Sequence, residues 1–130
     1  MALELQVLAL AGLLAAAQLL VFAVIANREL PQSWLVGPRD TPMPRALSAL
    51  AGRMQRAFNN HMEGLVLFAV AVVAMLGTGK QGLVTEVCSV TYLIARVAYV
   101  PAYWAGLPWI RSAIWAVGMG ATVVMLIAAL

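Results

Sequence analysis

Residues 53–79 decide the fold, and they read RMQRAFNNHMEGLVLFAVAVVAMLGTG. The second part, from Gly64 to Gly79, is uncharged and apolar enough to form most of a membrane-spanning helix, which needs about 20 such residues. The first part holds four polar side chains spaced 3, 4 and 3 residues apart, which places them within about 80° on one helix face. This face cannot contact lipid, because each unpaired charge in hydrocarbon costs at least about 2.5–3.5 kcal/mol. It must contact protein, water or a bound polar ligand, and its members are Arg53, Arg56, Asn60 and Glu63.

The composition of the chain is that of an integral membrane protein. Hydrophobic residues make up 64% of the 130 residues and charged residues only 10%, against about 25% in a typical soluble domain. Glu4 is the only charge ahead of the first apolar run, and this run is too long for a signal peptide, so we expect a retained helix. The net charge of +3 is small and no basic run with interleaved aromatic residues occurs, so no nucleic-acid partner is expected.

Four membrane-spanning helices account for the apolar runs, which predicts an all-α bundle formed by a single domain, residues 1–130. The spans are expected at about residues 5–26, 46–77, 83–104 and 108–130. The connection between the first two spans contains four prolines and is predicted to form an extended or turn-rich loop without helix. Pro101 is expected either to kink the third helix or to be accommodated by neighbouring helices.

The distribution of basic residues predicts the orientation of the helices in the membrane. The first and third connections hold four of the eight Lys and Arg residues, Arg28, Arg39, Arg45 and Arg111, with Arg53 and Arg56 close by. The second connection holds only Lys80, and neither terminus is basic. By the positive-inside rule, the long first connection and Arg111 are predicted to be cytoplasmic, with both termini on the opposite side. No retrieval tail is visible at the C-terminus, so a bacterial inner membrane is expected in preference to the endoplasmic reticulum.

A second polar stripe lies on the third predicted helix. Its four members are spaced 4, 3 and 4 residues apart and share one face of about 60°: Tyr92, Arg96, Tyr99 and Tyr103. Arg111 and Ser112 follow at the start of the fourth helix. In an antiparallel arrangement, the start of the second helix, the end of the third and the start of the fourth lie on the same side of the membrane. The two stripes and Arg111 are therefore expected to converge near the cytoplasmic interface.

The charges in these stripes do not balance. The two stripes and the start of the fourth helix hold a single acid, Glu63, and four arginines: Arg53, Arg56, Arg96 and Arg111. This leaves a net charge of +3 at about the same depth in the membrane. This excess indicates an anionic ligand, because a cluster of buried cations needs a compensating negative charge. The acid among the donors suggests that the same anion also carries an amine.

Simpler interpretations stay open for single residues. Arg96 and Glu63 fit a buried ion pair between helices, and Arg111 fits an arginine whose charge reaches the membrane interface. His61 lies off the polar face and is interpreted as a loosely packed or supporting residue. No metal site is expected there, because no further His or Cys ligand lies nearby.

Two segments resemble the MAPEG family, the membrane-associated proteins in eicosanoid and glutathione metabolism. Residues 53–63 are similar to the family's R-x-x-R-A-x-x-N-x-x-E signature, and residues 96–103 with 110–112 are similar to its second block. The resemblance covers nearly the whole chain. It implies a homotrimer in the lipid bilayer, whose three sites lie between neighbouring subunits and each bind glutathione in a bent shape near the cytoplasmic face.

The resemblance also implies roles for individual positions. Binding of the carboxylates and the amine of glutathione would fall to Arg53, Arg56, Asn60 and Glu63, with the site completed by Arg96, Tyr99, Tyr103 and, as a weaker match, Arg28. Arg111 matches the arginine that stabilises the thiolate, and Ser112 matches a hydroxyl that assists in some members. The chain departs from some relatives at Asn59, Val66 and Tyr99, where they carry a basic residue, a proline and a histidine. These departures concern the second substrate more than glutathione.

The expected function is that of a glutathione-dependent transferase or peroxidase acting on lipophilic electrophiles or lipid hydroperoxides. Conjugation, isomerisation and peroxide reduction all begin from the same thiolate, so the sequence does not choose among them.

Two other functional classes stay open. One is a non-catalytic relative that binds a lipid or a partner through the same pocket. The other is a small multidrug-type transporter, which needs an embedded carboxylate to attract cations, whereas arginines outnumber the one acid here.

Overall fold

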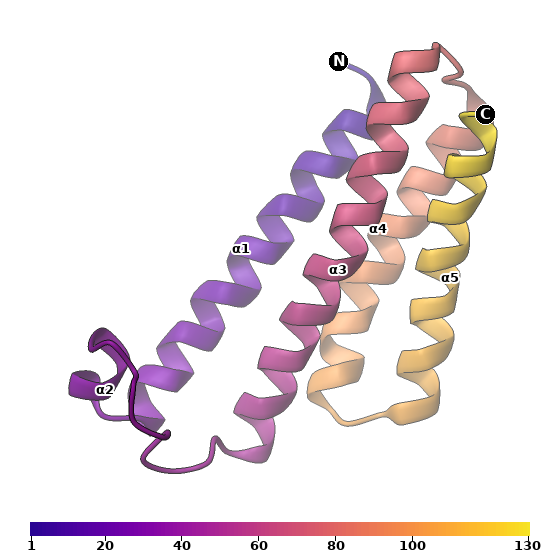
Figure 1. Cartoon of the computed structure of the whole chain (residues 1–130). Coiled ribbons are helices and arrows are strands. Elements are labelled where there is room, and N and C mark those ends of the chain that lie inside the picture. The colour runs from indigo at the N-terminus through magenta and orange to yellow at the C-terminus, as the bar shows by residue number, and fades with distance from the viewer.

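The computed structural model describes residues 1–130 as five helices joined by short connections and one long loop (Figure 1). The helices are α1 (Leu3–Glu29), α2 (Gln32–Val36), α3 (Ala49–Thr78), α4 (Leu83–Trp104) and α5 (Pro108–Ala128). All but α2 are long and apolar enough to cross a membrane, which makes four candidate spans. The expected all-α bundle of four membrane helices is confirmed.

The long loop contains a helix that the sequence interpretation excluded. α2 occupies five residues between Pro31 and Pro38, although the density of prolines predicted a loop without helix. The expectation was wrong because neither proline lies inside the helix. Pro31 precedes the first turn with φ −62°, and a proline at that position forfeits no helical hydrogen bond. Pro101, by contrast, lies inside α4, and the helix continues past it to Trp104.

The start of α3 is tied to the end of α1 by a capping residue. The Oγ atom of Ser48 accepts a hydrogen bond from the backbone N–H of Ala51 at 3.1 Å, as expected of an N-cap serine. The Glu29 carboxylate accepts from both the backbone N–H and the hydroxyl of Ser48, each at 2.7 Å. This junction fixes where α3 begins, and hence the height of the polar residues in its first turns.

The apolar core lies in the half of the bundle that contains both termini. Its centre is a parallel stack of the Phe68 and Tyr92 rings, with centroids 4.0 Å apart and an interplanar angle of 5°. The remaining members come from α1, from α3, and from α5 with its C-cap residue: Val7, Ala11, Ala71, Val72, Met75, Ala121, Met125 and Ala129. In the opposite half, the start of α3, the end of α4 and the start of α5 lie together (Figure 1), as the antiparallel arrangement predicted.

Candidate functional site

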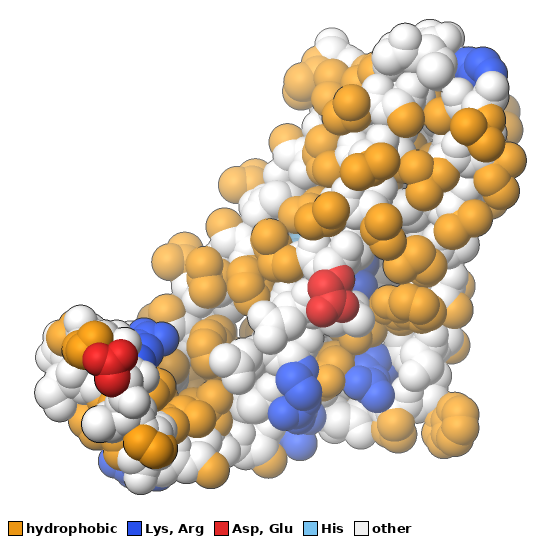
Figure 2. Space-filling view, in the orientation of Figure 1, with side chains coloured by type: hydrophobic (Ala, Val, Ile, Leu, Met, Phe, Trp, Pro, Cys, Tyr) orange, Lys and Arg blue, Asp and Glu red, His pale blue; other side chains and the backbone are white.

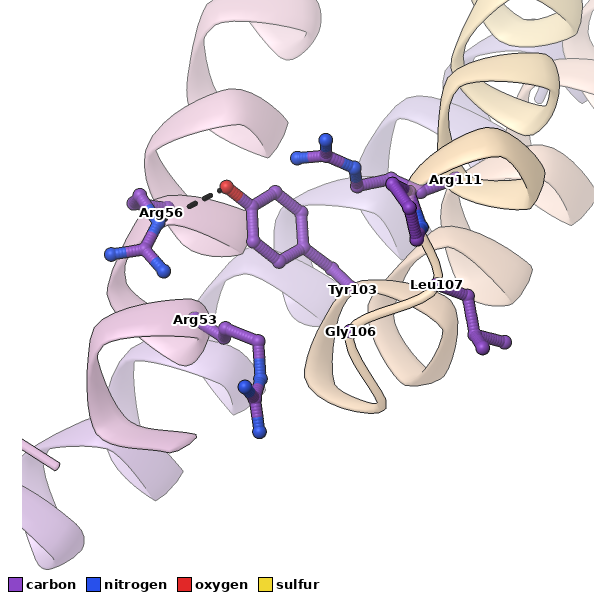
Figure 3. A pocket seen from close by; sticks show the side chains of 7 residues that line it. Arg53, Arg56, Tyr103, Gly106, Leu107 and Arg111 are labelled. Atoms are coloured by element: carbon purple, nitrogen blue, oxygen red, sulfur yellow. Dashed lines mark hydrogen bonds between the residues drawn. The ribbon is translucent and has the colours of Figure 1, made fainter. Parts of the chain in front are cut away.

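An open cavity of about 290 Å³ lies where the start of α3 meets the turn between α4 and α5 (Figure 3). Its charged lining consists of three arginines and contains no acid. The complete lining is Arg53, Arg56, Tyr103, Gly106, Leu107, Pro108 and Arg111. Figure 2 shows basic side chains gathered at this end of a face that is otherwise largely hydrophobic. The cavity therefore has a strong preference for negative charge.

Tyr103 lies between two of these arginines. The Nε–H of Arg56 donates to the Tyr103 hydroxyl at 3.2 Å. From the other side, the guanidinium carbon of Arg111 lies 4.5 Å from the centroid of the same ring (Figure 3). This is a cation–π distance, and it favours the charged guanidinium without using its N–H donors. Tyr103 thus orients both arginines while leaving donors available for a ligand.

Arg53 connects α3 to the end of α4. Its Nε–H donates to the carbonyl of Trp104 at 2.9 Å, one of the terminal carbonyls that a helix leaves without an internal partner. Gly106 follows with φ +75°, a conformation that glycine adopts without strain. The tight turn brings Pro108 into the first position of α5, and so places Arg111 one turn further on, facing Tyr103.

A second cluster lies behind the cavity, in the interior of the bundle. Arg96 is only 3% exposed, and its guanidinium carbon lies 4.4 Å from the centroid of the Tyr99 ring. The Nη1 of Arg96 donates to the Asn60 side-chain carbonyl at 3.0 Å, and its Nε donates to Nδ1 of His61 at 3.1 Å. Tyr99 and Tyr103 meet edge to face at 5.6 Å, which connects this cluster to the cavity.

The structure therefore brings most of the predicted residues together in two adjoining groups. Three others lie outside the cavity. Glu63 is exposed on α3, and Arg28 is exposed near the end of α1. The hydroxyl of Ser112 is exposed and donates to the carbonyl of Pro108 in its own helix at 3.0 Å.

The alternative of an Arg96–Glu63 ion pair does not hold, because the buried Arg96 donates to Asn60 and His61 instead.

His61 is the site residue for which the sequence left two interpretations, a loosely packed or a supporting residue. The first was wrong, because His61 is fully buried and both of its ring nitrogens have hydrogen-bond partners. A signal was present in the sequence. His61 continues the spacing of the buried residues of α3, which runs through Met54, Ala57, Gly64 and Phe68 in steps of 3 and 4. A polar residue in such a stripe needs buried partners.

Comparison with known proteins gives one finding. The sequence matches the family model of the MAPEG family over residues 7–130, a range that includes both clusters and nearly all of the four long helices. No curated protein and no solved structure matches the chain.

Proposed function

The chain belongs to the MAPEG family, and from this premise we propose that it is a membrane enzyme that activates glutathione. It would act as a glutathione transferase or peroxidase on lipophilic electrophiles or lipid hydroperoxides. The observation on which the proposal rests is the cavity with three arginines and no acid, at one end of a bundle that exposes many large apolar side chains.

Charge and size support glutathione as the ligand. Glutathione carries two carboxylates and one ammonium, and it becomes a dianion when its thiol ionises. Guanidinium groups bind carboxylates through paired N–H donors, which suits Arg53 and Arg56. A cavity of 290 Å³ lies near the lower end of small-molecule pockets, about 300–1,000 Å³, and so suits a tripeptide better than a lipid.

Arg111 is the residue proposed to activate the thiol. A free thiol with a pKa near 8.5 is only a few per cent ionised at pH 7, and the thiolate is the attacking species. A guanidinium beside the sulfur in a partly dry site lowers the thiol pKa by about 2, which corresponds to roughly 2.7 kcal/mol. Arginine suits this role because it stays protonated and does not neutralise the thiolate by giving up its own proton.

An apolar groove supports a lipophilic second substrate. It lies between α4 and α5, has a volume of about 260 Å³, and is lined by Thr91, Ile94, Ala95, Ala98, Ile114 and Val117. Ile114 is one helical turn beyond Arg111 in α5, so the groove begins about one turn from the residue proposed to bind the thiolate. An electrophile dissolved in the bilayer could approach the sulfur along this groove without entering water.

Calorimetry on the detergent-purified protein tests the proposal directly. We expect glutathione to bind at millimolar concentration, and the double variant Arg53→Ala/Arg56→Ala to bind at least about tenfold more weakly. Arg45→Ala is the matched control, because Arg45 is an exposed arginine of the long loop outside the cavity. Absence of binding to the unaltered protein would reject the proposed function.

Turnover separates an enzyme from a non-catalytic relative. The protein with bound glutathione is incubated with a lipophilic aryl halide and, separately, with an organic hydroperoxide. Conjugate formation supports the transferase, and oxidation of glutathione supports the peroxidase. Binding of glutathione without turnover of either probe would favour a protein that only binds its ligand.

A further inference from the structure

His61 on α3 connects three of the long helices, because its buried ring forms hydrogen bonds with α1 and with α4. It is the single histidine of the chain, and none of its surface is exposed. Its Nε2 lies 2.9 Å from the backbone carbonyl of Ala11 on α1, and its Nδ1 lies 3.1 Å from Nε of Arg96 on α4. The proposed chemistry of the cavity does not use this residue.

These two contacts define the protonation of the ring. A carbonyl can only accept a hydrogen bond, so Nε2 must carry a proton. The Nε of a charged arginine can only donate, so Nδ1 must be free of a proton. Only the neutral Nε2–H tautomer satisfies both partners, and a doubly protonated ring would place an N–H against the N–H of Arg96.

Arg96 needs such an acceptor because no acid accompanies it. Its Nε and Nη1 have neutral partners, His61 and Asn60, and its Nη2 is buried without any partner. A buried cation with an unpartnered donor nitrogen is unfavourable unless an anion or another acceptor completes its environment. Arg96 is also joined to the cavity, because the Tyr99 ring that covers its guanidinium contacts Tyr103 in the cavity wall.

We propose that His61 is a positioning residue for glutathione binding: held by the Ala11 carbonyl, it presents Nδ1 to Arg96 and thereby holds Arg96, and the Tyr99 ring that covers its guanidinium, in place against Tyr103 of the cavity wall. This inference rests on the proposed function, in which glutathione occupies the cavity that Tyr103 lines. His61 itself touches neither the sulfur nor the cavity lining.

Because His61 is the only histidine of the chain, the unaltered protein reports the protonation of the His61 ring directly. Protein labelled with ¹⁵N-histidine and purified without a histidine tag gives ring-nitrogen resonances from His61 alone. We expect the signature of the neutral Nε2–H tautomer, and a shift of the Nδ1 resonance when glutathione saturates the protein. An Nδ1–H tautomer, or an Nδ1 resonance that does not move at saturation, would overturn the proposal.

Two isosteric variants separate positioning from packing. Asparagine places its carbonyl oxygen near the position of Nδ1 and so keeps the acceptor for Arg96, but it cannot reach Ala11. Glutamine places its amide N–H₂ near the position of Nε2 and keeps the link to Ala11, but it offers nothing at Nδ1. We expect His61→Asn to bind glutathione within about threefold of the unaltered protein and His61→Gln to bind about tenfold more weakly.

The outcomes distinguish this inference from the function on which it rests. If His61 only links α1 to α3, His61→Gln should bind normally and His61→Asn should be impaired, which overturns the positioning role. If the unaltered protein does not bind glutathione, both the proposed function and the inference fail. Thermal unfolding of each variant is recorded in parallel, and the resonance experiment on the unaltered protein decides the question if either variant is unstable.

Discussion

Tyr103 is the residue on which the arrangement of the cavity depends. It accepts from Arg56 through its hydroxyl and contacts Arg111 through its ring. Two guanidinium groups near one ligand would otherwise repel each other, and the aromatic ring between them stabilises both charges. The three arginines thus retain distinct surroundings: Arg53 is bound to the end of α4, Arg56 is exposed beside the Tyr103 hydroxyl, and Arg111 lies over the ring.

Replacing Arg111 should separate activation of the thiol from binding of glutathione. In Arg111→Leu the cation beside the sulfur is lost, so the ultraviolet absorbance of the bound thiolate should disappear at neutral pH. The affinity for glutathione should change little, because Arg53 and Arg56 still bind the carboxylates. Arg111→Lys, which keeps a positive charge, should retain part of the absorbance. Full thiolate absorbance in Arg111→Leu would assign activation to another group.

At the scale of single residues, the sequence predicted which side chains share a helix face better than it predicted which residues they contact. Its periodicity placed Arg96 and Tyr99 on one face, and the structure joins them. It did not indicate that Arg96 is bound by His61 and Asn60, because helical spacing specifies a face but not the residue opposite. The partner of Arg96 depends on the rotation of α3 against α4, which is a property of the packed bundle.

At the scale of the elements, the turn between α4 and α5 sets the geometry of the cavity. Gly106 has φ +75°, a left-handed conformation that costs other residues about 1–2 kcal/mol. Gly106→Ala should therefore lower the midpoint of thermal unfolding and weaken glutathione binding, because Arg53 and Arg111 are anchored on either side of this turn. Gly120→Ala is a matched control in α5 with open space around it, and it should be neutral or stabilising. Equal melting of Gly106→Ala and the unaltered protein would contradict this assignment.

Hydropathy predicted the long helices because a membrane span leaves an unmistakable apolar run. The same measure could not predict α2, since a helix of five residues in the connecting loop makes no apolar run of its own. Prolines break helices from within, yet they are well tolerated just before the first turn, which is where Pro31 lies. The loop was therefore predicted correctly as a connection and wrongly in its local structure.

At the scale of the whole molecule, some of the predicted residues do not meet within one chain. Arg28 is exposed near the end of α1, which diverges from the α4–α5 turn at the end of the bundle that holds the cavity (Figure 1). Glu63 is exposed near the middle of a long apolar helix, where an unpaired carboxylate facing lipid costs at least about 2.5 kcal/mol. A neighbouring copy that covers Glu63 and receives Arg28 would account for both residues. Both positions fit the trimer that the family resemblance implies, in which Glu63 would accept from the glutathione ammonium.

Mixing two inactive variants tests whether sites form between copies. Arg28→Glu should repel the glutathione carboxylates and Arg111→Leu removes the cation beside the thiolate, so each variant alone should be inactive. In a mixed cyclic trimer, roughly one interface in three joins an intact Arg28 to an intact Arg111 of the neighbouring subunit, so random co-assembly should restore about a quarter of full activity. Mixing the two variants after separate assembly is the control and should restore nothing. A co-assembled protein that stays inactive would place each site within one chain, and an Arg28→Glu variant with full activity would exclude Arg28 from the site.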